Sequence, residues 1–245
     1  MPNIMDDLEE SIVKREMVLF FVIDQSGSMV GQKMGAVNTA VREVIPELKT
    51  VGGADVDLKI AVLTFSDGCQ WMYNTPISVE HFTWNKVWAG GVTDLGAACK
   101  ELDEKMSKSG FLKSPSGSVA PAIFLMSDGQ PSDEYKYGIA KLHDNNWFKH
   151  AIKIAVAIGE DADPDVLAEF TGNREAVITV HTPEALRKMI RFVSITSSQI
   201  GSKTQPVASG NIKTKQDDMI QQVQNYVESD PVLDPNNIST DGDAW

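Results

Sequence analysis

The chain has 245 residues, of which 22 are basic and 34 acidic, so its formal net charge is −12. Nucleic acids and anionic membrane surfaces bind clustered Lys and Arg, so this balance argues against both as partners and favours a cation or a partner with basic patches. Two cysteines, Cys69 and Cys99, exclude a disulfide framework and a Cys-rich zinc site.

Short apolar runs alternate along the chain with longer segments whose apolar residues recur at helical spacing. The predicted elements, in chain order, are strand 17–24, helix 33–48, strand 56–65, helix 94–107, strand 121–126, helix 135–146, strand 149–158, helix 163–170, strand 177–180 and helix 182–198. Pro46 is expected to kink the first helix or to end it early. Residues 70–73 are expected to pair antiparallel with the second strand, and Thr182 to cap the last helix.

This alternation of fully apolar strands with helices predicts a doubly wound, Rossmann-like α/β fold, with helices on both faces of a mostly parallel sheet. We expect the domain to span residues 17–200, between a polar extension (1–16) and an acidic extension (201–245). In the acidic extension, residues 213–228 predict a helix and 229–245 a disordered tail. No apolar run approaches the ~20 residues of a membrane span, and the first is too short for a signal peptide, so a cytoplasmic protein with reduced thiols is expected.

Hydroxyl and carboxylate side chains stand where several predicted strands end or helices begin. Asp24, Ser26 and Ser28 follow the first strand. Thr93 precedes the second helix, and Asp128 follows the third strand. Because ligands of a doubly wound sheet bind outside the carboxyl ends of its strands, we expect these five residues on one rim.

Three hydroxyls and two carboxylates suit a hard cation such as Mg²⁺, with Mn²⁺ or Ca²⁺ in its place. Mg²⁺ prefers octahedral oxygen ligands at about 2.0–2.1 Å and keeps water readily. An ion held mainly by hydroxyls stays electrophilic, so an Asp or Glu of a protein partner is the expected further ligand. The alternative is a cluster of helix caps and turns, in which the same side chains satisfy backbone N–H groups.

Other residues near this rim are expected to support the site rather than to ligate a metal. Asp94 and Asp133 are expected to cap or support neighbouring segments. For Ser66 and Asp67, a supporting role and a plain turn both stay open. Tight turns on the rim are expected at two glycines, Gly27 and Gly91.

These motifs, in this chain order, resemble those of the von Willebrand factor A family. The resemblance covers about residues 17–198 and matches all five positions of that family's metal-ion-dependent adhesion site, with Asp24, Ser26, Ser28, Thr93 and Asp128. A narrower resemblance is to the TerY-like bacterial A domains of tellurium-resistance gene clusters. It is carried by Asp24-Gln25-Ser26-Gly27-Ser28-Met29, Ala36-Val37-Asn38, Thr64-Phe65 and the run from Phe124 to Asp133. Such proteins are encoded beside a protein kinase and a PP2C-type phosphatase, so the resemblance implies a metal-dependent adaptor with such partners.

An enzyme is the main alternative to a binding module. A phosphatase with an aspartyl nucleophile would also begin with an apolar strand followed by Asp24, but its chemistry needs a second acid two residues later, where Ser26 stands. The motifs Gly-x-x-x-x-Gly-Lys-Ser/Thr, Gly-x-Gly-x-x-Gly and Gly-x-Ser-x-Gly do not occur in the sequence. With no evident general base, a non-enzymatic protein is predicted, and a metal-dependent phosphate-ester hydrolase is the alternative.

Two further features leave alternatives open. The acidic extension could offer the metal a carboxylate ligand, in cis or from a neighbouring molecule. The candidates are Asp217, Asp218, Glu228, Asp230, Asp234, Asp241 and Asp243. The alternative is that the extension is a simple solubilising tail. Trp84, Trp88 and Trp147 are expected in the core, with an exposed interaction surface before Thr93 as the alternative.

Overall fold

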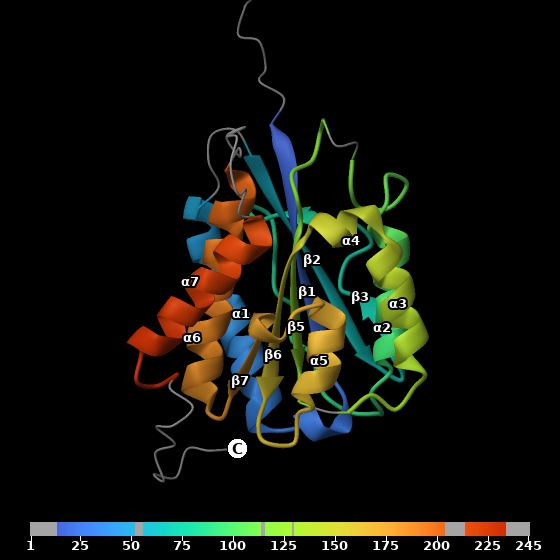
Figure 1. Cartoon of the computed structure of the whole chain (residues 1–245), viewed down its shortest axis with the longest axis vertical. Helices are drawn as coiled ribbons and strands as arrows, with labels where there is room; N and C mark the ends of the chain where they lie inside the picture. The colour runs from blue at the N-terminus through green and yellow to red at the C-terminus, as the bar shows by residue number, and fades with distance from the viewer. Residues whose placement is uncertain (1–13, 52–55, 114–115, 129, 204–213, 234–245) are drawn as a thin grey trace, which may run out of the picture.

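The computed structural model describes residues 14–51, 56–113, 116–128, 130–203 and 214–233. Its centre is a seven-stranded sheet in the order β3-β2-β1-β5-β6-β7, with β4 also paired to β2 (Figure 1). Only β3 and β4 run antiparallel to their neighbour β2, which confirms the predicted mostly parallel, doubly wound sheet. The strands are β1 (Arg15–Asp24), β2 (Val56–Ser66), β3 (Gly68–Trp71), β4 (Ile77–Ser78), β5 (Ala122–Ser127), β6 (Ile152–Ile158) and β7 (Val177–Val180).

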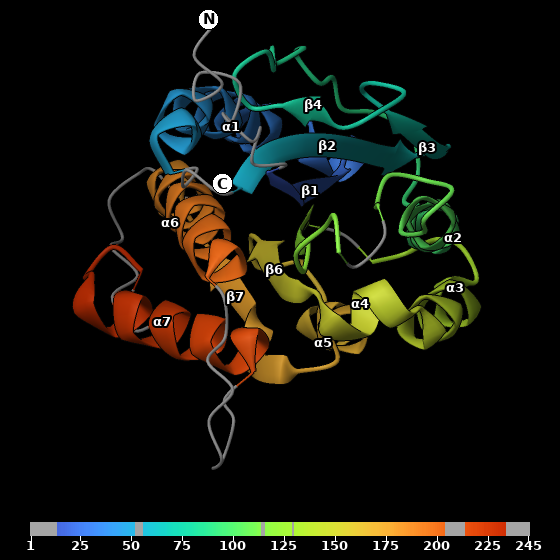
Figure 2. The same ribbon diagram turned by 90° about the horizontal axis from the view of Figure 1, so that it is seen from above.

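Helices cover both faces of the sheet. They are α1 (Gln32–Val51), α2 (Leu95–Lys105), α3 (Tyr135–Asp144), α4 (Asn146–His150), α5 (Pro164–Thr171), α6 (Pro183–Ser202) and α7 (Lys215–Ser229). Seen from above, α1, α6 and α7 form one layer and α2 to α5 form the other (Figure 2). None of the helices in the described ranges is long and apolar enough to cross a membrane.

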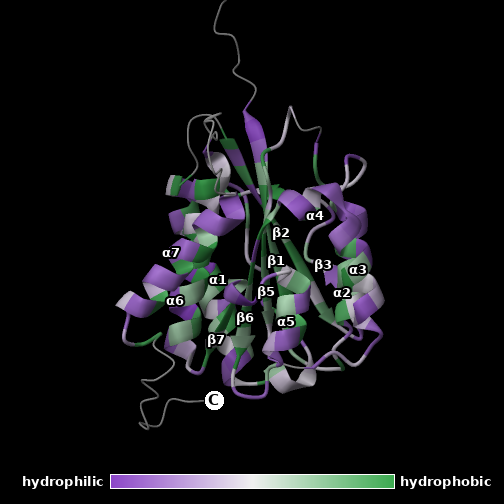
Figure 3. Ribbon diagram, in the orientation of Figure 1, coloured by the Kyte–Doolittle hydropathy of each residue, from purple (hydrophilic) through white to green (hydrophobic). Residues whose placement is uncertain are grey.

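The central strands are buried on both faces, and β1 shows why their sequences are apolar throughout. Leu19 and Phe21 belong to the core that β1 shares with α1 and α6. Val18 and Phe20 belong to the core under α2 and α5. Apolar residues follow the strands in the middle of the molecule, while the outer faces of the helices are polar (Figure 3). A strand between two helical layers therefore has no polar face, as the parallel sheet requires.

The first helix does not end early at Pro46, which contradicts one of the two expectations for this residue. Pro46 lies inside α1, which continues to Val51 instead of ending early. A proline in a helix removes one backbone hydrogen bond and strains the preceding turn. Ile45 and Leu48, on either side of it, are buried in the core shared with α6. The tertiary packing of these side chains outweighs the local cost of the proline.

The segment after α3 also differs. The predicted helix 135–146 is interrupted at Asn145, whose side chain accepts hydrogen bonds from the backbone N–H groups of Trp147 and Phe148. This cap starts the short helix α4, so residues 149–150 are helical, and β6 begins at Ile152 rather than at residue 149. The short-range pattern of apolar residues did not reveal the cap.

The C-terminal extension packs on the domain. Helix α6 continues to Ser202, and the bounds of α7 differ from those of the predicted helix 213–228 by at most two residues. The predicted disorder at 229–245 is wrong at its start, because the described chain continues to Leu233, which is buried in the core. Residues 234–245, like residues 1–13 of the predicted N-terminal extension, lie outside the described ranges. Both cysteines are free thiols, Cys99 buried and Cys69 partly buried.

Candidate functional site

The candidate residues lie at the end of the molecule to which the parallel strands point, the lower end in Figure 1. Asp24 is the last residue of β1, and Asp128 follows β5, the neighbouring strand. Ser26 and Ser28 lie in the turn after β1, which includes the 3₁₀ helix η1 (Gly27–Met29). The parallel pairing of β1 with β5 brings the first and the last of these motifs together.

Asp24 is fully buried, and both of its carboxylate oxygens accept hydrogen bonds. Oδ1 accepts from the backbone N–H of Ser26 at 2.8 Å, and Oδ2 accepts from the hydroxyl of Ser127 at 2.6 Å. Burial raises the pKa of the Asp24 carboxyl above its ordinary value, and the nearby Asp128 acts in the same direction, while the hydrogen bonds from Ser127 and Ser26 lower it. A cation beside this carboxylate would offset the cost of burying its charge.

A chain of short contacts leads from Ser26 to Asp128. The hydroxyl oxygens of Ser26 and Ser28 are 3.0 Å apart, and the Ser28 hydroxyl donates to Asp128 Oδ1 at 2.7 Å. Asp128 is fully buried, as Asp24 is. Four of the predicted site residues are thus gathered in one cluster of oxygen atoms.

Lys33 belongs to this cluster, although the sequence patterns did not single it out. Its ammonium, on the first turn of α1, lies 2.5 Å from Asp128 Oδ2. The Lys33 side chain is largely buried, with 14% of its surface exposed. The site is therefore held together by a lysine as well as by hydroxyls.

Thr93 is buried and its N–H donates to the Ser132 hydroxyl at 2.9 Å, while the loop that precedes it lies against the turn after β1. The N–H of Gly27 donates to the carbonyl of Gly91 at 2.9 Å, and the N–H of Gly90 donates to the carbonyl of Gln25 at 2.7 Å. Gly91 has a φ of +88°, which a glycine adopts readily. Gly27 was expected for a tight turn, but the structure gives it another role. A Cβ at Gly27 would lie 3.3 Å from the Gly91 carbonyl oxygen, so the absence of a side chain at Gly27 permits the close approach of the two loops.

Neighbouring polar residues fix the loops around the cluster. Ser66 accepts a hydrogen bond from the Gln25 side chain at 3.3 Å, and Asp67 accepts one from the N–H of Val92 at 3.4 Å. Asp133 accepts from the first N–H groups of α2, at Gly96 and Ala97, at 3.0 Å each. These contacts give Asp133 a capping role, and they join Ser66 and Asp67 to the two loops of the rim.

A family model of the von Willebrand factor type A domain matches residues 19–192. The chain belongs to this family. Domains of the family commonly mediate metal-dependent protein interactions, and they are generally non-enzymatic interaction modules. No curated protein matches the chain.

Several solved structures share the fold of this A domain at low sequence identity. A von Willebrand factor type A protein from Catenulispora acidiphila is 20% identical, with a TM-score of 0.57, over 75% of this chain and 43% of that chain. The ArnB paralog VWA2 from Sulfolobus acidocaldarius is 18% identical, with a TM-score of 0.54, over 72% and 44%. Proximal thread matrix protein 1 from the mussel byssus, solved with a zinc-occupied MIDAS motif, is 17% identical, with a TM-score of 0.56, over 76% and 48%. The A domain thus spans less than half of each of these chains.

The donor set of the A domain fits a hard cation. The clustered oxygens of Asp24, Ser26, Ser28 and Asp128 are carboxylates and hydroxyls, the ligand types that Mg²⁺, Mn²⁺ and Ca²⁺ prefer. Within the described ranges, no group of three or more His, Cys, Asp or Glu side chains is placed to hold a metal ion. A metal in this A domain would bind through two carboxylates and hydroxyl groups.

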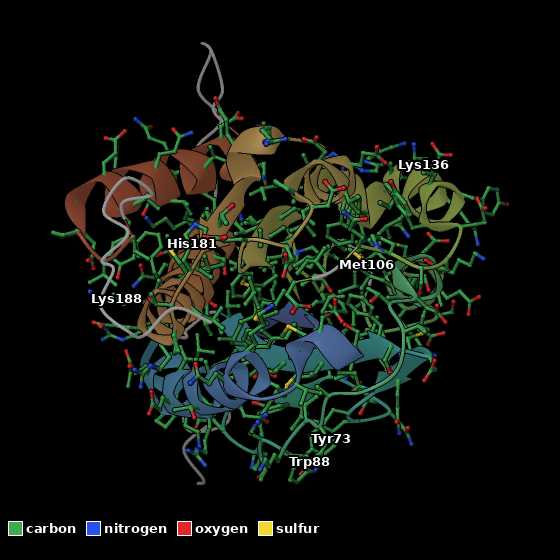
Figure 4. All side chains as sticks on the ribbon, turned by 90° about the horizontal axis from the view of Figure 1, so that it is seen from below. Tyr73, Trp88, Met106, Lys136, His181 and Lys188 are labelled. Carbon is green, nitrogen blue, oxygen red and sulfur yellow. The ribbon has the colours of Figure 1, made fainter. Side chains whose placement is uncertain are left out.

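The aromatic segment before Thr93 corrects one expectation. Trp88 is not in the core: 72% of its surface is exposed, and Figure 4, which looks onto the site end of the A domain, places it at the periphery. The ammonium of Lys86 lies 3.9 Å from the centre of its ring. The neighbouring Val87 is held by the side-chain amide of Asn38, which bonds both its N–H (2.8 Å) and its carbonyl (2.9 Å). The exposed ring therefore stands on a fixed piece of backbone.

Two of the candidate carboxylates, one at each end of α7, are engaged within the fold, whereas Asp218 is partly buried and Glu228 is exposed. Asp217 forms a capping box with Thr214 at the start of α7. Asp230 lies 2.8 Å from the Lys188 ammonium on α6. Of the other expected carboxylate donors, Asp234, Asp241 and Asp243 lie outside the described residues.

Proposed function

We propose that this A domain is a divalent-metal-dependent protein-interaction module. In this proposal Asp24, Ser26, Ser28, Thr93 and Asp128 hold Mg²⁺, or Mn²⁺ or Ca²⁺ in its place, and an Asp or Glu of a partner completes the ligand shell. One observation carries the proposal: the contacts that connect Asp24 and Ser26 through Ser28 to Asp128 at the carboxyl ends of two adjacent strands.

The charges of the cluster support a binding role. A divalent cation that displaces the Lys33 ammonium from Asp128 balances the two buried carboxylates, and the neutral hydroxyls leave the ion able to attract a further anionic oxygen. When bound, the metal supplies a point of attraction for a carboxylate, and the chain's residues supply its fixed position. The rigid rim, tied by the Gly27–Gly91 and Gly90–Gln25 hydrogen bonds, keeps that position constant.

The same contacts disfavour the hydrolase alternative. A phosphatase with Asp24 as its nucleophile would need a general acid two residues later, but Ser26 stands there, with its hydroxyl 3.0 Å from that of Ser28. We therefore expect no turnover of phosphate esters by this domain.

The narrower resemblance extends the proposal to a biological setting. The matched TerY-like motifs support an adaptor in a tellurium-resistance or stress-response system, and the partner class they suggest is a protein kinase or a PP2C-type phosphatase. The acidic extension is proposed as a competing ligand of the metal, through its carboxylates beyond Leu233.

Calorimetric titration of the metal-stripped protein with Mg²⁺ and Mn²⁺ tests the site itself. We expect one binding site in the wild type and none in Asp24→Asn, which keeps the size of the side chain but removes its charge. Asp144→Asn, at an exposed carboxylate at the end of α3, is the matched control and should bind as the wild type does. Equal metal binding by wild type and Asp24→Asn would overturn the proposal.

A further inference from the structure

The open edge of the sheet lies at β7, and α7 runs beside it. β7 pairs on one side with the second half of β6, from Ala155 to Ile158. Helix α7 lies outside the residues that match the family model, which end at residue 192. What α7 builds at this edge is therefore a feature of this chain rather than of the shared fold.

The start of α7 is tied to β6 at Lys153, two residues before the point where β7 begins to pair with β6. The Gln216 side chain accepts from the backbone N–H of Lys153 at 2.6 Å and donates to the carbonyl of Lys153 at 2.8 Å. A side-chain amide thus takes the place of a neighbouring strand at this point. From there α7 diverges from β7 toward its C-terminal end, as both Figure 1 and Figure 2 show.

The divergence leaves a groove of about 500 Å³ between β7 and the second half of α7. Its volume is in the range of about 300–1,000 Å³ that is usual for ligand sites. The floor and walls are partly apolar, through Val177, Ile178, Val223, Val227 and Leu233. An apolar side chain that entered the groove would therefore be sheltered from water.

The walls of the groove are fixed by contacts with α6. Tyr226 stacks on Phe192, with ring centres 4.0 Å apart and planes inclined by 4°. The ion pair of Asp230 with Lys188 holds the end of α7, and Leu233 is buried beside it. The groove is thus pre-formed, which reduces the entropy lost when a ligand binds.

The edge of β7 offers hydrogen bonds to the groove. The carbonyl of Val180 accepts from the N–H of Gly159, which follows β6, so Val180 directs its backbone groups toward β6. Backbone groups alternate in direction along a strand, and Thr179 therefore directs its N–H and carbonyl away from β6, toward the groove that it helps to line. An extended chain pairs naturally with such an edge.

The groove carries negative charge. Glu175 and Glu228 line it, and both are exposed. Neither forms an ion pair with any residue of the described ranges. A ligand with a basic side chain at this point would find two carboxylates without a cation.

We propose that this groove is a docking site for an extended segment of a partner protein, which adds as a strand to β7. The segment places an apolar side chain against Val227 and Leu233 and a Lys or Arg beside Glu175 and Glu228. The chain's own residues 234–245 are a poorer occupant, because they contain three Asp and no Lys or Arg. A second copy of the chain brings the same two Glu to the edge and is disfavoured for the same reason.

The test uses the whole chain in EDTA, so that a failure here is separate from a failure of the metal site. A phage-displayed library of linear peptides is selected on the wild type, and enriched peptides are synthesised and titrated by fluorescence anisotropy. We expect peptides with a basic residue near alternating apolar residues. Their affinity should fall about tenfold or more in the double variant Glu175→Lys/Glu228→Lys, since two attractions become repulsions.

Two further variants keep the outcome unambiguous. Thr179→Pro removes the outward N–H and should also weaken binding. Glu104→Lys, an exposed change on α2 in the opposite helical layer, should not. The proposal is overturned if no peptide is enriched, or if the enriched peptides bind the edge variants as they bind the wild type. Binding that appears only after deletion of residues 234–245 would identify the chain's own tail as the occupant and also overturn it.

Discussion

The ion pair between Lys33 and Asp128 occupies a carboxylate that the proposed metal would bind. The two residues are 95 positions apart, and their ammonium and carboxylate are 2.5 Å apart. The lysine supplies one positive charge to two buried carboxylates. A metal that binds Asp128 must compete with this ammonium, so Lys33 stabilises the metal-free protein and weakens its affinity for cations.

The variant Lys33→Met tests this competition. We expect it to bind Mg²⁺ about tenfold more tightly than the wild type, a gain of about 1.4 kcal/mol, because the metal no longer displaces a cation. Without metal the variant should be less stable, since the buried Asp128 has lost its partner. Calorimetric titration measures the Mg²⁺ affinity, and urea unfolding in EDTA measures the stability without metal.

Lys136→Met is the control for the loss of a lysine. This residue is exposed on α3, and Figure 4 shows it at the periphery of the molecule. It should leave both readings unchanged. An unchanged or lower Mg²⁺ affinity in Lys33→Met would contradict the competition.

Among the elements, α7 is the one whose sequence says least about its place. Its capping box and helical spacing are local signals, and they predict the helix well. Its contact with β6 is not local: Gln216 bonds the backbone of Lys153, 63 residues earlier. Nothing in the local sequence indicates that this glutamine will hydrogen-bond the backbone N–H and carbonyl of a strand residue.

The variant Gln216→Ala leaves the N–H and the carbonyl of Lys153 without their partner. We expect a loss of roughly 1–3 kcal/mol in the free energy of unfolding, the usual cost of an unsatisfied buried polar group. Urea unfolding measures it. Gln224→Ala, an exposed change on the same helix, should cost less than about 0.5 kcal/mol. Equal losses in the two variants would show that the amide pairing does not stabilise the fold.

The stability of the whole molecule should depend on pH through Lys153. Its buried ammonium donates to the carbonyls of Phe148 (2.9 Å) and Ala151 (3.0 Å), and burial lowers the pKa of Lys153 to about 8. Between about pH 8 and about pH 10.5 the unfolded chain holds a proton that the folded chain has released. The contribution of Lys153 to the free energy of unfolding therefore rises with pH through this window.

The variant Lys153→Met isolates the pH-dependent contribution of Lys153 to the free energy of unfolding. From about pH 7.5 to about pH 10, the free energy of unfolding of the wild type should rise relative to that of the variant, by at most about 3 kcal/mol. Urea unfolding at both pH values gives the difference. The Cys69 thiol, whose pKa burial raises to about 11, acts in the opposite direction, but both proteins share it. A constant difference between the two proteins would contradict the shifted pKa.

The sequence by itself determined the fold class and most of the candidate site. The reason is that short segments of the sequence carry both signals. The apolar runs can be buried only in a covered parallel sheet, and Asp24, Ser26 and Ser28 directly follow one of these runs. The order of the motifs was enough to place Asp128 on the same rim.

Only the tertiary structure decided the contacts between segments. It brought Lys33 to Asp128, placed Gln216 on the edge of β6 and left Trp88 exposed on a loop held by Asn38. These outcomes depend on which elements become neighbours and at what distance. No local pattern contains that information, because the energies that select a neighbour come from packing across the whole core.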